Sequence, residues 1–343
     1  MVRGRTSPAP AAAGPPDGPA PCAATGLTRR FPGASRPAVR DVSVTVRPGE
    51  IFGVLGRNGA GKTTLIRMLV GLCRPDSGRV LLRGREITGN AALGASGLAY
   101  LPQRESALAD TTVRTAVETT ARLRGLPRRD ARAACDGVLA ELGITGLAGR
   151  RVARLSGGQR RIAGVAAALA GSGPLLVLDE PTTGLDLDAR RAVWSALARR
   201  RDAGSSVVLV THNVLEAETV LDRVLVLHAG RAVATGTPGE LKARFDGRVR
   251  LDLRWRGRPP LDPGDLDGEV AADGRRWSVR LPLGRARRLL DVLLAGPAFA
   301  ELDDFALAPP SLEDVLLACD AGPPPPDDPA PSDADAGDRE AVR

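Results

Sequence analysis

Hydrophobic positions along this chain form short runs that predict an α/β core. Val42, Val44 and Val46 alternate with polar residues, as the side chains of a half-buried strand do. Residues 51–55 and 175–178 are continuously apolar, and the second run is typical of a strand in a sheet covered on both faces. Further short strands and one hairpin are expected at 79–83, 97–101, 206–210 and 224–234.

Helical patterns lie between these strands and dominate one long insert. One helix ends before Pro127, and a second runs from about residue 129 to residue 143. Another helical pattern follows at 188–201. The patterned region is therefore predicted as one α/β domain over residues 25–245, with a helical insert at about 111–161.

After residue 247 the chain loses the apolar runs that are typical of parallel strands. Strand-like and helical runs follow at 249–255, 277–281, 286–294 and 311–319. These runs predict a small α+β appendage over residues 246–319. Residues 1–24 are rich in Pro, Ala and Gly, and residues 320–343 are rich in Pro, Asp and Ala, so both tails are expected to be disordered.

Charge and cysteine content narrow the class of protein. The net charge is +8, and eleven Arg against four acidic residues lie within residues 111–161. A solvated helical face explains this excess better than a docking surface, and no nucleic-acid partner is expected. The four cysteines are scattered without a C-x-x-C pair, which favours reduced, structural thiols in the cytoplasm.

Two features bear on membrane association. The N-terminal residues lack the apolar segment of a signal peptide. Residues 162–178 carry no charge, but the Gly-Ser-Gly-Pro sequence at 171–174 interrupts them, which predicts a helix, a turn and a strand. We therefore expect a soluble chain whose role at a membrane comes through a partner.

A phosphate-binding loop follows the first continuous apolar run. Residues 56–64 match G-x-x-x-x-G-K-[ST] and precede a helical pattern, as the phosphate loop of a nucleotide-binding protein requires. The chain has 48 Lys and Arg residues, of which only two are Lys, and one of them stands at the phosphate-contacting position. The alternative is a Gly-rich turn with a chance Lys. The expected nucleotide contacts are Gly56, Arg57, Asn58, Gly59, Ala60, Gly61, Lys62, Thr63 and Thr64, with the Thr63 hydroxyl also a ligand of Mg²⁺.

Two acidic residues follow the apolar run at 175–178. Asp179 and Glu180 would lie at the carboxyl end of a central strand, where α/β sheets bind ligands. We expect Asp179 to hold Mg²⁺ and Glu180 to act as the general base that activates water toward the γ-phosphate of ATP. The alternative interpretation is an acidic turn without a catalytic role. A GTPase is disfavoured because neither Lys62 nor Lys242 follows Asn, as an N-K-x-D motif would require.

Residues 155–161 read Leu-Ser-Gly-Gly-Gln-Arg-Arg and give the chain a specific resemblance. The segment is similar to the signature of ABC transporter ATP-binding subunits, and it lies upstream of the acidic strand as in that family. The resemblance implies a P-loop NTPase core with an antiparallel β subdomain and a helical insert. It also implies a homodimer, in which the signature of one subunit contacts ATP on the other. The signature residues expected to contact ATP are Ser156, Gly157, Gly158 and Gln159.

Four further positions match the family one by one. Gln103 resembles the Q-loop glutamine, which contacts Mg²⁺ and water, and Asp186 resembles the D-loop aspartate at the dimer seam. His212 resembles the switch histidine that contacts the γ-phosphate. Phe31 stands where the adenine-stacking residue is most often Tyr, so a packing role for this ring is the alternative. Arg57 departs from the family at a variable position where Pro is common.

The end of the appendage sharpens the resemblance. Residues 310–315 read Pro-Ser-Leu-Glu-Asp-Val, which is similar to the close of drug-exporter ATPases of the daunorubicin-resistance type. The resemblance implies an ATPase on the cytoplasmic face of the cell membrane. It would power a separate integral membrane permease and export a small hydrophobic compound, such as an antibiotic, a drug or a lipid. A soluble ABC ATPase that acts on ribosomes, nucleic acid or cofactor assembly is the alternative.

Overall fold

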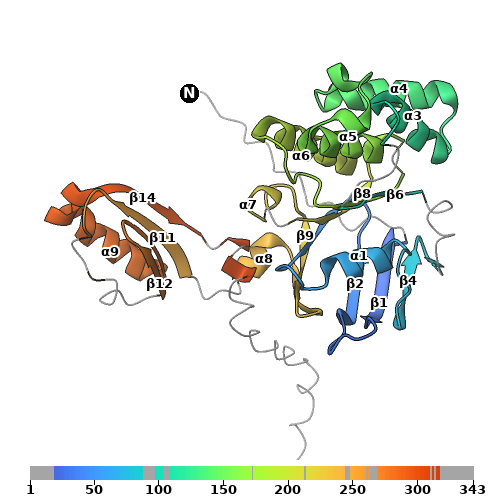
Figure 1. Cartoon of the computed structure of the whole chain (residues 1–343). Coiled ribbons are helices and arrows are strands. Elements are labelled where there is room, and N and C mark those ends of the chain that lie inside the picture. The colour runs from blue at the N-terminus through green and yellow to red at the C-terminus, as the bar shows by residue number, and fades with distance from the viewer. Residues whose placement is uncertain are drawn as a thin grey trace, which may run out of the picture.

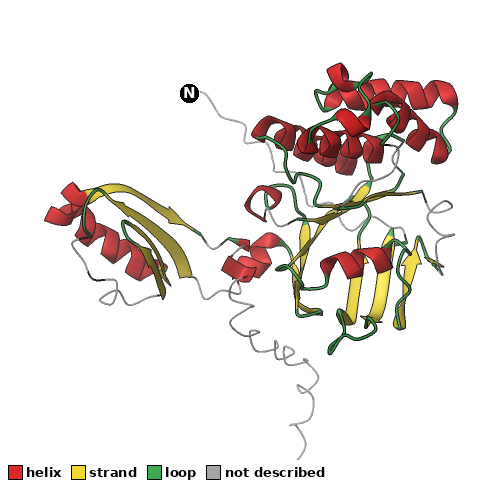
Figure 2. Ribbon diagram, viewed as in Figure 1, coloured by secondary structure: helices red, strands yellow, loops and turns green. Residues whose placement is uncertain are grey.

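The described part of the computed structural model contains three sheets, with helices packed between or against them (Figures 1 and 2). Its described residues are 19–87, 97–103, 109–171, 173–211, 214–243, 248–259, 262, 269–309, 311–312 and 314–316. None of the helices in these ranges is long and apolar enough to cross a bilayer.

The central sheet has six strands in the order β10-β9-β3-β8-β7-β6. Five of these strands, β3, β6, β7, β8 and β9, run parallel to one another. The sixth, β10, runs antiparallel to β9. The strands are β3 (Ile51–Leu55), β6 (Leu98–Leu101), β7 (Leu175–Asp179), β8 (Ser206–Val210), β9 (Arg223–His228) and β10 (Arg231–Gly236). The predicted strands and the predicted hairpin of this region are confirmed.

Both faces of the central sheet are covered, because alternate side chains of β3 enter two different hydrophobic clusters. Phe52 and Val54 pack with α1 (Lys62–Leu69), whereas Ile51 and Leu55 pack with α5 (Gly157–Leu169) and α6 (Leu187–Asp202). Figure 1 shows α1 on one side of the sheet and α5 and α6 on the other. This two-sided burial explains why β3, β7 and β8 are buried along their whole length and almost entirely apolar.

A second, antiparallel sheet packs beside α1 in the order β2-β1-β4-β5. Its strands are β1 (Cys22–Arg29), β2 (Val39–Val46), β4 (Ser77–Leu82) and β5 (Arg85–Glu86). The sequence placed residues 1–24 in a disordered tail, and this boundary needs correction because β1 begins at Cys22. Cys22 and Ala24 are buried against the neighbouring strands, but their short Ala- and Thr-rich segment gave no clear alternation.

The predicted helical insert is confirmed as a layer above α5 (Figure 1). It contains α3 (Val113–Leu123) and α4 (Arg128–Glu141). The Thr112 hydroxyl caps α3 by accepting from the Thr115 amide. At the other end, the half-buried Arg124 guanidinium donates to the carbonyls of Ala167, Ala168 and Ala170, each at 2.8 Å. Arg124 thus satisfies the free carbonyls at the end of α5 and fixes the insert to it.

The appendage is a third sheet in the order β12-β13-β11-β14, with α9 (Leu283–Ala295) on one face. Its strands are β11 (Arg248–Trp255), β12 (Glu269–Asp273), β13 (Arg276–Pro282) and β14 (Leu302–Ala308). Trp255 and Trp277 meet edge to face at 5.5 Å inside its small core. The strands β11 and β13 and the helix α9 were predicted, whereas β12 and β14 were not.

The chain then returns from the appendage to the central domain. Leu312 and Val315 are fully buried in the same cluster as α5 and α6, and the Leu312 amide donates to Glu218 at 3.2 Å. Asp314, between these two apolar residues, accepts from Arg280 of β13 at 2.7 Å. The sequence pattern predicted residues 311–319 as part of the appendage. The described residues of this segment contact both the appendage and the central domain, so the segment connects the two.

Candidate nucleotide-binding site

The phosphate loop links β3 to α1 at the carboxyl edge of the central sheet. Gly61 caps α1 with φ 105°, and a Cβ atom at this position would lie 2.2 Å from the Ala38 carbonyl oxygen. Only glycine fits this combination of conformation and close packing. Arg57, Asn58 and Gly59 are exposed around the loop, while Ala60 is buried. The loop therefore presents backbone groups and the start of α1 outward, as anion binding requires.

Lys62 fills the inside of this loop. Its Nζ atom donates to the carbonyl oxygens of Gly56 at 2.6 Å and Arg57 at 3.0 Å, and the residue is 9% exposed. Burial lowers the pKa of Lys62, while the carboxylates of Glu180 and Asp179 act in the opposite direction. One cation and two acids thus share the same edge of the sheet. Thr63 and Thr64 follow in the first turn of α1 and are half-buried.

Asp179 ends β7 with a carboxylate that is almost fully buried. Its Oδ2 atom has no hydrogen-bond partner in the described part of the chain. Burial raises the pKa of Asp179, and the charge of Glu180 raises it further, against the effect of Arg161 and Lys62. A buried carboxylate oxygen without a hydrogen-bond partner is a suitable ligand for a divalent cation. Together with the Thr63 hydroxyl, the oxygen donors here fit Mg²⁺.

Glu180 adopts a strained backbone conformation directly after β7. Its φ angle is +58°, which non-glycine residues seldom adopt, and its amide donates to the Val210 carbonyl of the neighbouring strand at 2.8 Å. The Thr183 hydroxyl donates to Glu180 Oε2 at 3.2 Å, and the residue is 8% exposed. The position of this carboxylate is therefore fixed from both its main chain and its side chain.

Arg161, on α5, connects this helix to the ends of β6 and β7. Its motif had predicted no separate role for it. Its buried guanidinium donates to the carbonyl oxygens of Pro102 at 2.8 Å and Glu180 at 3.0 Å, and also to that of Asp179. A longer bond of 3.4 Å reaches the Gln103 carbonyl. The available signal was periodicity, since Arg161 shares a helix face with buried residues four and seven positions later, Val165 and Ala168.

Gln103 lies just after β6 and exposes its side chain, while its backbone is held by Arg161. The structure thus brings the main chain of Gln103 to Asp179 and Glu180 through one shared guanidinium. Because β6 is the immediate neighbour of β7, all three residues stand at the same edge of the sheet.

The signature segment forms the start of α5. Ser156 and Gln159 form a reciprocal capping box, with both hydrogen bonds at 3.3 Å, so the Gln159 side chain is engaged at the helix end. Gly157 is exposed. A Cβ atom on Gly158 would lie 2.6 Å from the Gly184 carbonyl oxygen, which shows how closely the signature packs on the following loop.

The remaining predicted positions lie farther out. Asp186 caps α6 by accepting from the Ala189 amide at 2.8 Å, and its residue is exposed. Phe31 is 40% exposed, and the Arg29 guanidinium lies 5.3 Å from the centre of its ring. A hollow of about 420 Å³ lies between the segment 33–38 and Gly59 of the phosphate loop. His212 lies outside the described residues.

Family models match two parts of the chain. Residues 39–183 match the family described as ABC transporter, and they contain both the phosphate loop and the two acids after β7. Residues 248–309 match the family described as ABC transporter C-terminal domain. The second match coincides with the appendage sheet and α9.

Several curated relatives match well beyond the phosphate loop. The Nod factor export ATP-binding protein I of Rhizobium etli is 38% identical over 292 residues, 81% of this chain and 87% of that protein. The daunorubicin resistance ATP-binding protein DrrA3 of Streptomyces coeruleorubidus is 35% identical, over 85% of this chain and 93% of that protein. The methionine import ATP-binding protein MetN of Cupriavidus necator is 40% identical over 62% of this chain and 63% of its own length. The chain spans only 14% of the rat ATP-binding cassette sub-family A member 7, which it matches at 34% identity over 85% of its own length.

Solved structures share the fold of the central domain. A structure described as the ATP-binding subunit of an ABC transporter has a TM-score of 0.61 at 25% identity, covering 65% of this chain and 92% of that one. A dimeric ATP-binding cassette in a post-hydrolysis state bound to ADP and Pi has a TM-score of 0.59 at 21% identity, covering 63% of this chain and 98% of that one. The fold, the two family matches and the near full-length relatives lead to one conclusion: this chain belongs to the ATP-binding proteins of the ABC transporter family.

Proposed function

We propose that this chain binds and hydrolyses ATP with Mg²⁺ and thereby powers a separate membrane permease. The observation that carries this proposal is the convergence of Lys62, Asp179 and Glu180, all buried, at the edge of the sheet where the phosphate loop begins. Burying one cation with two acids costs free energy, so a bound ligand explains the arrangement better than stability does.

Phosphate binding would replace the internal contacts of Lys62. In the structure this ammonium group donates to two carbonyl oxygens of its own loop. We infer that it donates to the β- and γ-phosphate oxygens when ATP enters, while the loop amides and the start of α1 hold the remaining charge. Mg²⁺, held through Asp179 and Thr63, would neutralise charge on the same two phosphates.

Hydrolysis requires a base beside the γ-phosphate. Glu180 is the candidate because it follows the metal-binding Asp179 directly and its carboxylate is held by Thr183. In this role it takes a proton from the attacking water. Arg161 is a positioning residue, since it holds the backbones of Asp179, Glu180 and Gln103 relative to one another. Gln103 and His212 are proposed to orient the water and contact the γ-phosphate.

A second subunit would complete the site. At the exposed start of α5, the first-turn amides of Gly157 and Gly158 suit a phosphate, whereas the amides of Ser156 and Gln159 are engaged in the capping box. We propose that the two glycine amides and the side chains of Ser156 and Gln159 contact ATP bound to the other copy in a homodimer, and that Asp186 lies at the seam. The dimeric ATP-binding cassette with the same fold supports this arrangement. Phe31, two residues before Gly33 in the lining of the 420 Å³ hollow, is the proposed adenine contact.

Export is the proposed direction, and the extent of the matches supports it. The relative named for Nod factor export aligns over 81% of this chain, which must include part of the appendage. The relative named for methionine import aligns over only 218 residues, close to the length of the central domain. We therefore propose export of a small hydrophobic compound, with the chain attached to the cytoplasmic face of the membrane through its permease.

The experiment combines the two parts of the proposal. The chain and its Glu180→Gln variant are each co-expressed with a polytopic membrane protein encoded next to it, and phosphate release is measured on the purified material. Both should co-purify with the membrane protein and bind ATP. The variant should lose hydrolysis by roughly a thousandfold, because it cannot accept the proton, and accumulate as an ATP-bound dimer. Asp188→Asn, on the exposed first turn of α6, serves as the charge-matched control.

Three results would count against the proposal. Normal hydrolysis by Glu180→Gln would remove Glu180 from its role as base. The absence of Mg²⁺-dependent hydrolysis by the wild-type chain, with and without the membrane protein, would refute the ATPase itself. Hydrolysis with no membrane partner, together with co-purification of nucleic acid or ribosomes, would favour the soluble alternative.

A further inference from the structure

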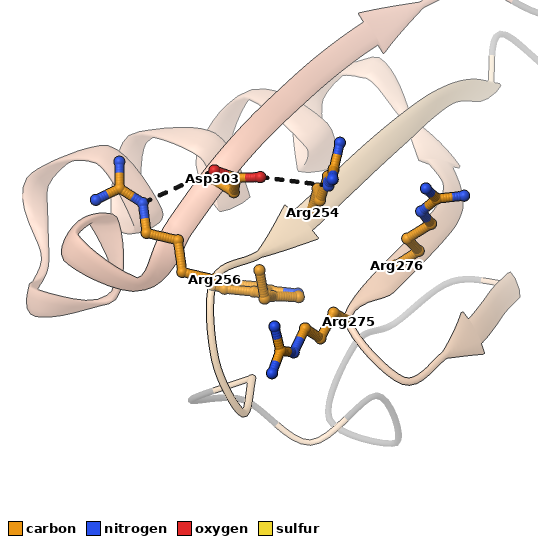
Figure 3. Close-up of a pocket in the computed structure, with 6 residues that line it drawn as sticks. Arg254, Arg256, Arg275, Arg276 and Asp303 are labelled. Carbon is orange, nitrogen blue, oxygen red and sulfur yellow. Dashed lines mark ion pairs between the residues drawn. The ribbon is translucent and has the colours of Figure 1, made fainter.

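An arginine-rich hollow lies on the appendage, away from the nucleotide site. It has a volume of about 370 Å³ and is lined by residues of β11, β13, the turns that follow or precede them, and β14. Figure 3 shows four guanidinium groups around it and a single carboxylate. The lining residues are Arg254, Trp255, Arg256, Arg275, Arg276 and Asp303.

The carboxylate neutralises only one side of this hollow. Asp303 lies 3.3 Å from the Nε atom of Arg254 and 4.0 Å from that of Arg256, and these are the two ion pairs drawn in Figure 3. Arg254 and Arg256 nevertheless keep more than half of their side-chain surface exposed. No ion pair of Arg275 or Arg276 is found among the described side chains. The four arginines therefore hold an excess of positive charge around one space.

Trp255 adds an unused donor to the wall of the hollow. The residue is 1% exposed, and its indole Nε1 atom has no hydrogen-bond acceptor in the described part of the chain. A buried indole N–H normally has a partner, because leaving it unpaired costs free energy. The site thus combines guanidinium donors with an indole donor, and Asp303 is the one acceptor side chain among its lining residues.

We propose that this hollow binds a phosphoryl group of a phosphorylated anion, held by the four arginines and the indole N–H of Trp255. A guanidinium group can donate two parallel hydrogen bonds to the oxygens of one phosphate. An anion whose oxygens only accept hydrogen bonds matches a set of groups that only donate them. Asp303 then acts as an internal competitor that keeps Arg254 and Arg256 oriented when the site is empty. The alternative, an ordinary solvated basic face, does not explain the buried donor without an acceptor.

The position of the hollow links this ligand to the ATPase. The opposite end of the same two strands carries Arg250 and Arg280, and both are ion-paired with Asp314 of the segment that returns to the central domain. β11 and β13 pair directly along their length. An anion bound at one end of these strands is therefore connected through a continuous sheet to the segment that attaches the appendage.

The test is calorimetric titration of the full chain, with saturating Mg²⁺-ADP to occupy the phosphate loop. Inorganic pyrophosphate is the first probe, and succinate controls for carboxylates. Pyrophosphate should bind, and the double variant Arg275→Ala/Arg276→Ala should weaken its binding about tenfold or more through the loss of two charge-assisted contacts. Trp255→Phe, which keeps a smaller aromatic ring but removes the N–H, should weaken binding by a smaller factor of about three to ten.

Removal of Asp303 gives a result of the opposite sign. Asp303→Asn should tighten pyrophosphate binding by about threefold or more, because it frees two arginines from their internal partner. Asp304→Asn changes the net charge equally but removes a carboxylate from the neighbouring hollow, so it should have a clearly smaller effect. Equal effects of the two substitutions would reduce the site to general electrostatics and overturn the proposal.

Two sources of phosphate are distinguished in parallel. Glycerol 1-phosphate represents a soluble compound, and vesicles of phosphatidylglycerol against phosphatidylcholine represent a lipid headgroup. Arginine-dependent binding of either probe supports the phosphoryl site and identifies its source. Three outcomes would overturn the proposal. The first is that pyrophosphate, glycerol phosphate and vesicles all fail to bind. The other two are binding that is unchanged in Arg275→Ala/Arg276→Ala and succinate binding as tight as that of pyrophosphate. Mg²⁺-ADP fills the phosphate loop during the titration, and none of these substitutions lies in that loop. The outcome therefore does not depend on the ATPase proposal.

Discussion

The central domain and the appendage use arginine in different ways. In the central domain Arg161 is 7% exposed, and it donates to main-chain carbonyls of two site-forming segments, at the ends of β6 and β7. In the appendage Arg280 keeps 33% of its side chain exposed, and its partner is a carboxylate on the segment that returns to the core. The first arrangement fixes backbone geometry around a reactive site, whereas the second joins two bodies at a boundary that water can reach.

The hydrophobic clusters show the same contrast. Two extensive clusters cover both faces of the central sheet, whereas the core of the described part of the appendage has nine buried residues, two of which are tryptophans. A core this small contributes modest stability, so its attachment to the larger domain through Leu312, Asp314 and Val315 carries more weight. Charges can therefore be buried for catalysis in the central domain, while the appendage keeps its arginines at the surface.

The largest effect that distinguishes the two regions is expected from Arg161→Lys. A lysine cannot reach all of the carbonyls that the guanidinium joins, so buried acceptors lose their donor at a cost of about 2–4 kcal/mol in the free energy of unfolding. Since Asp179 and Glu180 then lose their relative position, the turnover number should fall about tenfold or more, with a smaller change in ATP affinity. Urea unfolding and steady-state hydrolysis measure the two quantities.

The matched control for this prediction is Arg199→Lys, because Arg199 is 53% exposed in its side chain and pairs with Glu141 at the surface. It should change both quantities little. A fall in ATP affinity as large as the fall in turnover would show that Arg161 supports binding rather than the catalytic geometry.

A smaller effect is expected from Asp314→Asn at the junction. Burial acts to raise the pKa of Asp314, but hydrogen bonds from Ser311 and the contact with Arg280 outweigh it and hold the pKa below its usual value. A lowered pKa in the folded state means that the carboxylate stabilises the junction above the unfolded pKa of about 3.9 and that this contribution disappears as the pH falls further. The substitution should cost about 1 kcal/mol at pH 7.

The pH dependence gives the discriminating measurement for Asp314. The difference in unfolding free energy between wild type and Asp314→Asn should stay constant from about pH 7 to 5 and narrow only below about pH 4. Unfolding of the appendage can be followed through the fluorescence of Trp255 and Trp277. A difference that already narrows between pH 7 and 5 would mean that the pKa is not lowered.

Much of the central domain could be predicted from sequence because its strands are buried on both faces. The runs at 51–55, 175–178 and 206–210 agree with β3, β7 and β8 to within one residue. The appendage strand β12 was missed because it is short of large apolar residues, and β14 was missed because it exposes most of its side chains and its apolar residues do not alternate regularly. A strand at the edge of a one-sided sheet leaves a weaker pattern than a strand inside a covered one.

The residues of the nucleotide-binding site could be predicted where a motif specifies both the residue type and its spacing. The phosphate loop, Asp179 and Glu180 were found by spacing, and the structure brings Lys62 and these acids to one edge. Motifs could not show that Gln159 and Asp186 cap helices with their side chains, or that Arg161 links three segments. Those facts depend on side-chain direction and, for Arg161, on contacts between residues 18 to 59 positions apart, which spacing alone does not encode.

The central claim is that ATP is held between the phosphate loop of one copy and the signature of another. It is tested most directly by mixing two inactive variants. Lys62→Ala removes the phosphate contact, and Gly157→Asp places a negative charge at the start of α5, where an added side chain meets no neighbouring atom within 4 Å. Each variant alone should show almost no Mg²⁺-dependent hydrolysis.

In the mixture, half of the dimers contain one variant of each kind, and each of these has one intact site of two. The account therefore predicts recovery of about one quarter of the wild-type rate of ATP hydrolysis at equal total protein. If the wild-type chain is active and the mixture stays at the level of its two parents, the site is not shared between copies and the central claim is contradicted.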